Sequence, residues 1–128
     1  MTVGLSAANF ANTICSALSS GSATLIASHV QMHNDDPGSA GTANVATGVT
    51  GRQALTWGTP SGGSVSVSNT PISWSATGTD TVSYLSTWNA STSGTFRFSA
   101  QLTAPKAVSN GDTLNLTSLT FALTPIAA

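Results

Sequence analysis

The chain has 128 residues and a formal net charge of −1, and only 5% of its residues are charged, against roughly 25% in ordinary domains. It contains 20 Ser, 20 Thr and no Glu, so its polar surface consists mainly of hydroxyl and amide groups. This composition argues against nucleic-acid and membrane partners, because it offers no basic stripe for phosphates or anionic lipid and no run of about 18 apolar residues. It favours a surface that packs against other protein, since hydroxyl groups lose less on desolvation than charged groups do.

The first predicted element is a short amphipathic helix over residues 5–18. Phe10, Ile14 and Leu18 recur every four residues and would share one face, and Ser6 is suited to cap the first turn. Cys15 is the only cysteine, which rules out a disulfide within the chain. We interpret it as a small buried hydrophobic residue.

The next predicted element is a strand over residues 24–33, with Ile26, Val30 and Met32 on one face. The cluster of turn-forming residues that follows it predicts a long loop over residues 34–51.

From residue 52 onward, short runs of alternating apolar and polar residues follow one another, separated by Gly, Asn, Asp and Pro. The inward-facing residues predicted from this alternation are Leu55, Trp57, Val65, Val67, Ile72, Trp74, Ala76, Val82, Tyr84, Phe96, Phe98, Ala100, Leu102, Leu114, Leu116, Leu119, Phe121 and Leu123. Val82 and Tyr84 lead to Trp88, with Leu85 breaking the alternation. Residues 109–112, SNGD, have the composition of a tight turn. Seven or eight short strands without intervening helices predict a mainly β fold, an antiparallel two-sheet sandwich or jelly roll with a short N-terminal helix, as a single domain over residues 1–128.

The stretch SHVQMHNDDPGSAG, residues 28–41, concentrates residues that could bind a metal ion. On an extended strand, His29 and His33 would lie about 13 Å apart, too far for one ion. His33 with Asp35 and Asp36 gives fewer ligands than a zinc or calcium site needs. We therefore expect no metal and no cofactor.

The same stretch also has the composition of a corner at the end of a strand. Asn34 and Asp35 can form side-chain turns, Pro37 fixes φ, and Gly38 permits a positive φ. We expect this structural role.

Arg52 and Arg97 are two of the three cations in the chain. We expect them to pair with Asp35, Asp36 or Asp80 and so restrain loops, or to form pairs between subunits.

The large aromatic residues allow two interpretations. Trp57, Trp74, Trp88 and Tyr84 could stack on sugars at an exposed face, but three of the four have the phase of inward-facing strand residues. We expect most of them to pack in the core.

Catalytic motifs are absent from the sequence. Ser, His and Asp all occur, but no G-x-S-x-G elbow and no G-x-x-x-x-G-K-[ST] phosphate loop is present, and no Glu is available as an acid of raised pKa. We expect that the protein is not an enzyme.

A series of short motifs runs along the chain: Met32-His33, Pro37-Gly38, Gly41, Asn44-Val45, Gly48, Arg52-Gln53-Ala54-Leu55, GGSVSVSNTPISW, Trp88, the Gly94 turn and LTAPKAVSNGDTL. With these motifs, nearly the whole chain, including the short N-terminal helix, resembles a widespread group of small structural proteins of tailed bacteriophages. Members of the group commonly read L-H-T-x-x-P-G at the first corner and Y-x-R-Q before the next strand. The chain departs from the pattern at Asn34, Asn44 and Thr50, where Thr, an acid and an aromatic residue are usual.

This resemblance implies a virion structural protein. The N-terminus has no basic region before its apolar residues, so we expect the protein to be made and folded in the host cytoplasm. We expect a capsid decoration protein that self-associates and binds other virion proteins, the major capsid protein or tail proteins. The alternative is a tail fibre or tail-tip component, an adhesin that binds a host glycan. Residues 1–6 and 124–128 are candidates for contacts with neighbouring subunits.

Overall fold

A computed structural model describes residues 4–123 of the chain. One helical segment comes first, a π-helical turn η1 (Ala7–Ala11) that continues into helix α1 (Asn12–Ser20). The strands that follow are β1 (His29–His33), β2 (Gln53–Ala54), β3 (Ser64–Ser66), β4 (Ile72–Ser75), β5 (Asp80–Trp88), β6 (Phe96–Val108), β7 (Thr113–Leu116) and β8 (Thr120–Ala122).

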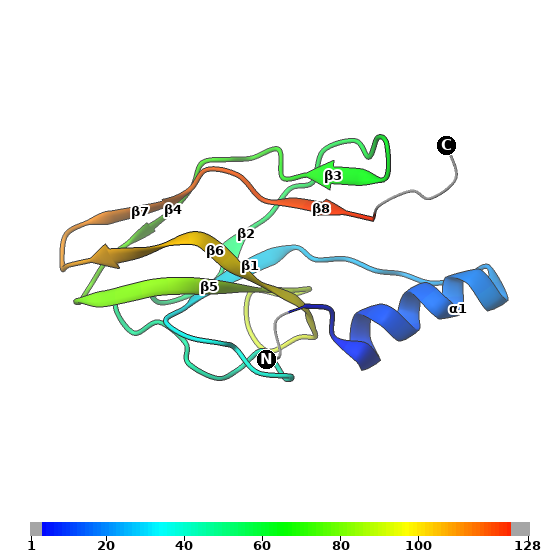
Figure 1. The fold of residues 1–128 in the computed structure, drawn as a ribbon, viewed down its shortest axis with the longest axis horizontal. Helices are drawn as coiled ribbons and strands as arrows, with labels where there is room; N and C mark the ends of the chain where they lie inside the picture. The colour runs from blue at the N-terminus through cyan, green and yellow to red at the C-terminus, as the bar shows by residue number, and fades with distance from the viewer. Residues whose placement is uncertain (1–3, 124–128) are drawn as a thin grey trace.

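The strands form two layers (Figure 1). One layer is an antiparallel sheet of order β2-β1-β5-β6. The other consists of the antiparallel pairs β3-β8 and β4-β7. A hydrogen bond connects these two pairs: the Val67 N–H, just after β3, donates to the Leu119 carbonyl, just before β8, at 2.9 Å. The two pairs therefore form one continuous layer. The predicted mainly β, antiparallel sandwich with a short N-terminal helix is confirmed.

Both layers contribute to the main core. The buried side chains of this core are Val30, Met32, Ala46, Val49, Leu55, Val67, Ile72, Trp74, Ala76, Val82, Leu85, Val108, Leu114 and Leu116. Burial of this apolar set is the main favourable contribution to folding. Trp74 and Trp88 are buried as predicted, whereas Trp57 and Tyr84 are half-buried.

The sequence alternation fails in the second half of β5 because both faces of the strand are covered there: residues 85–88 are all buried. The pairing of β5 with β6 also shifts, as at a β-bulge. Val82 lies opposite Lys106 and Tyr84 opposite Gln101, so the additional residues belong to β6.

The helical segment begins as predicted but packs differently. The Ser6 hydroxyl accepts a hydrogen bond from the Asn9 N–H at 3.3 Å and caps the first turn. Phe10 is buried, but Leu18 is 90% exposed, so the body of the protein covers the apolar face of this helix only at its first turn. Cys15 is exposed, and its interpretation as a buried residue was wrong. The reason is that α1 projects beyond the end of the sandwich (Figure 1).

The first strand is shorter than predicted. It begins at His29, and Ile26 is 53% exposed, so the expected strand over residues 24–28 was wrong. The physical reason is the length of the neighbouring strand: β5 ends at Trp88, which lies opposite His29 and whose carbonyl accepts from the Ser28 N–H at 2.7 Å, so residues 24–27 have no β5 residue opposite them. Residues 34–51, predicted as a long loop, contain no helix and only an isolated bridge between Val45 and His33.

Candidate functional site

The corner after β1 is built from side-chain turns. The Asp35 carboxylate accepts from the Asp36 N–H at 2.7 Å, and the Asp36 carboxylate accepts from the Gly38 N–H at 2.9 Å. Gly38 has φ +75°, a conformation that glycine adopts without steric cost. Pro37 is buried, and its carbonyl accepts from the Ala43 N–H at 2.9 Å. These hydrogen bonds connect residues of the same loop and fix its conformation.

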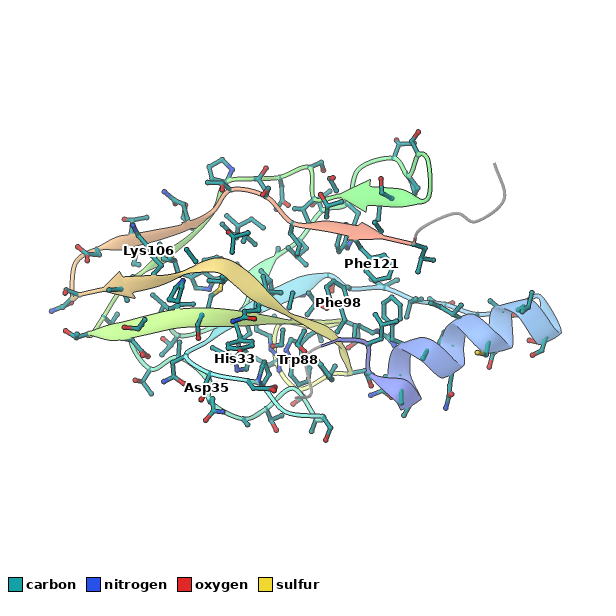
Figure 2. All side chains as sticks on the ribbon, in the orientation of Figure 1. His33, Asp35, Trp88, Phe98, Lys106 and Phe121 are labelled. Atoms are coloured by element: carbon teal, nitrogen blue, oxygen red, sulfur yellow. The ribbon has the colours of Figure 1, made fainter. Side chains whose placement is uncertain are left out.

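His33, at the start of this corner, belongs to a buried network with Ser86 and Trp88. Figure 2 labels His33 and Trp88. Its Nδ1 lies 2.7 Å from the Ala43 carbonyl oxygen, and its Nε2 lies 2.7 Å from the Ser86 hydroxyl. The Trp88 Nε1–H donates to the same hydroxyl at 2.8 Å.

These contacts fix the tautomer of His33. A carbonyl oxygen only accepts, so Nδ1 carries the proton and Nε2 accepts from the Ser86 hydroxyl. Desolvation by burial lowers the pKa of His33 below its usual 6.5; the backbone contacts oppose this shift, and the charge of Arg52 adds to it. The ring is therefore neutral at pH 7.

A His–Ser pair at this distance has the spacing of a general base and its nucleophile. Here, however, His33 and Ser86 are both 0% exposed, so a substrate has no access to the hydroxyl. The network stabilises the junction between β1, β5 and the corner.

No group of three or more His, Cys, Asp or Glu side chains that could hold a metal ion occurs within residues 4–123. In the same range, no helix has the length and apolar character needed to cross a bilayer.

Arg52 restrains the loop that follows β5. Its guanidinium donates to the carbonyls of Ala90 at 3.0 Å and Ser93 at 2.6 Å, and to the Gln31 amide oxygen at 3.2 Å. It also lies 3.7 Å from the centre of the Trp88 ring, as in a cation–π contact.

Arg97 joins the helical segment to the sheet. It is buried in β6 and donates to the Ile26 carbonyl at 2.9 Å and to the Asn9 carbonyl at 2.6 Å. These hydrogen bonds of both arginines go to neutral oxygens, namely backbone carbonyls and, for Arg52, the Gln31 amide. The pairing of the two arginines with Asp35, Asp36 or Asp80, or with another subunit, stays a prediction.

Asp80 restrains a third loop. Its carboxylate accepts from the N–H groups of Thr47, Gly48 and Thr81 and from the Asn34 amide. Partial desolvation acts to raise the pKa of Asp80, but these hydrogen bonds outweigh it and lower the pKa below its usual value.

An apolar hollow lies at the end of the sandwich that carries α1. Its volume is about 490 Å³. Phe10 packs against Phe98 and Phe121 with ring centres 5.9 and 5.2 Å away. Phe98 and Phe121 are labelled in Figure 2. The residues that line the hollow are Phe10, Ile14, Leu25, Ile26, Ala27, Trp57, Gly58, Pro60, Val65, Phe98, Phe121 and Leu123.

The same end exposes large apolar side chains. Leu123 is 55% exposed, Ile26 53% and Ile14 36%. Most exposed apolar residues on soluble proteins are scattered singly, and a contiguous group marks an interaction site. We call this surface, formed by α1 and the hollow beside it, the apolar end. It is the candidate functional site.

Sequence reasoning missed this surface because it assigned these residues to the core. The available signal was that the predicted helix contains no charged residue, whereas a helix with a solvated face usually carries several. The pairing of His33 with Ser86 had no local signal, since 53 residues separate them. Residues 1–3 and 124–128, predicted to contact neighbours, lie outside the described residues, and Leu5 and Ser6 pair with β6 of the same chain.

Comparison with known families gives one match that spans nearly the whole chain. The family model described as Podophage GP4 fiber I protein gp80 matches residues 6–124. No curated protein matches the chain.

Proposed function

The chain belongs to the Podophage GP4 fiber I protein gp80 family, and on that premise we propose that it serves in the tail fibre. It is a bacteriophage fibre-type structural protein, so it resides in the virion and associates with other virion components. The finer proposal is that it is a fibre component that self-associates and has no catalytic activity.

The observation that carries this proposal is the apolar end. A small protein that exposes Ile14, Leu18, Ile26 and Leu123 on one end has a surface suited to an assembly. The interior favours the same conclusion. The one buried His–Ser pair is fully hydrogen-bonded and closed to solvent, which suits a rigid building block better than an enzyme.

The capsid decoration role that the sequence favoured remains a prediction. The family description names a fibre, which supports the tail alternative instead. Glycan binding by the fibre also stays a prediction. Trp57 is the aromatic residue to examine, because it is half-buried and lines the hollow.

Antibody labelling of intact virions tests the location. Gold-conjugated antibodies against this chain should label the tail region in electron micrographs, and virions treated with pre-immune serum provide the control. Label spread evenly over the head would overturn the fibre proposal in favour of capsid decoration.

A further inference from the structure

The apolar face of the helix extends beyond the part of the protein that could cover it. Phe10, Ile14 and Leu18 follow at four-residue spacing and therefore share a face. Phe10 is 5% exposed, Ile14 is 36% and Leu18 is 90%. The exposure of these side chains thus increases with each turn along the helix, although all of them are apolar.

A hollow that could receive such an apolar face lies beside it. Ile14 forms part of its lining, so the projecting Leu18 and the hollow belong to one continuous surface. An apolar projection and an apolar hollow on the same surface make that surface self-complementary, as interfaces between identical subunits are.

The distribution of charge favours an identical partner. Residues 4–28, 55–68, 89–96 and 117–123, which include most of the apolar end, contain no Asp, Glu, Lys or Arg. The nearby Arg97 is buried and bound to two carbonyls. When two copies of a charged surface meet, like charges repel each other, and an uncharged surface does not have this electrostatic cost. A charged partner could form no ion pairs with these residues.

We propose that the apolar end binds a second copy of this chain, with the Ile14–Leu18 face of one helix seated in the hollow of the other copy. The proposal deepens the fibre role and rests on it for its biological setting. The contact itself is a property of the purified protein, so it is tested separately from the location in the virion.

The test is sedimentation equilibrium of the full chain over a range of concentrations. The wild-type protein should have a mass above that of the 12.8 kDa monomer. Leu18→Asp should weaken the self-association by about 10-fold or more, because it removes a buried leucine and adds a charge. Leu18 is almost fully exposed in the single chain, so this variant should keep the circular dichroism spectrum of the wild type.

Ser19→Asp is the matched control. It adds the same charge one residue further along α1, about 100° around the helix, and should leave the mass unchanged. A monomeric wild type, or equal masses for the two variants, would overturn the proposal. If the wild type is monomeric and Ile126→Asp increases the binding of an apolar dye, the chain's own segment 124–128 occupies the hollow, which also overturns it. Neither result bears on where antibodies label the virion.

Discussion

His33 and Ser86 lie 53 residues apart in the chain and share a hydrogen bond of 2.7 Å between Nε2 and Oγ, in the interior of the protein. Trp88 donates to the same hydroxyl. One serine thus satisfies two buried side chains and links β1 to the far end of β5. Removing a shared partner leaves both groups without a hydrogen bond in a site closed to water, which is costly.

Ser86→Ala should therefore destabilise the protein by roughly 2–4 kcal/mol, since both the His33 nitrogen and the Trp88 N–H lose their partner. Urea unfolding followed by tryptophan fluorescence measures this change. Ser75→Ala, on an exposed position of β4, is the control and should change the free energy of unfolding by less than about 0.5 kcal/mol. Equal effects of the two variants would contradict the structural role of Ser86.

Stability should also depend on pH through His33. Burial lowers the pKa of His33 in the folded state below 6.5, so below that pH the unfolded chain binds more protons than the folded one. Linkage then requires the free energy of unfolding to fall as pH drops from about 6.5 toward the folded-state pKa, by at most about 1.4 kcal/mol per pH unit. Above pH 6.5 this contribution is fully present.

Urea unfolding at pH 7.5, 6.5 and 5.5 measures this dependence. His33→Gln should flatten it while lowering stability at pH 7.5, and His29→Gln, at a half-exposed position, should retain it. An unchanged pH profile in the His33 variant would exclude His33 as its source.

Arg52→Lys should loosen the loop after β5. The guanidinium holds the carbonyls of Ala90 and Ser93 and covers the Trp88 ring, and an ammonium group cannot reproduce this planar arrangement of donors. We expect a loss of about 1–2 kcal/mol and faster amide hydrogen exchange at residues 89–95. Lys106→Arg, at an exposed position, serves as the conservative control. Unchanged exchange in the Arg52 variant would show that the loop is held by other contacts.

Gly41→Ala should be among the most damaging small substitutions. Gly41 has φ +72°, and a Cβ there would overlap the Phe96 ring, part of the packing beside Trp88. Gly62→Ala is matched, because φ is +58° but no atom lies within 4 Å of the added carbon. The Gly62 variant should lose about 1–2 kcal/mol from backbone strain. The Gly41 variant should lose clearly more free energy of unfolding than the Gly62 variant. Equal midpoints of thermal unfolding for the two variants would contradict the overlap with Phe96.

Sequence periodicity predicted the parts of the fold in which burial follows alternation. Ile72, Trp74 and Ala76 are all buried, and the Asp112 carboxylate accepts from the Ser109 N–H in the predicted turn at 109–112. Periodicity did not predict burial where contacts with distant parts of the chain determine it. The pattern of Phe10, Ile14 and Leu18 identifies one helix face but does not tell whether the body of the protein reaches far enough to cover it.

The polar contacts of the interior and of the loops were harder to predict than the fold. The carbonyl acceptors of Arg52 and Arg97 could not be predicted, because every residue carries a backbone carbonyl and the sequence does not show which one lies nearby. His33 was weighed as a metal ligand, while its partner Ser86 is one of 20 serines and is selected only by the register of β1 on β5.

The most direct test of the fibre role is the number of copies of this chain per purified virion, by quantitative mass spectrometry against the major capsid protein. The fibre proposal predicts a small fraction of the capsid subunit number. A number comparable to the capsid subunit would contradict it and establish decoration of the whole shell.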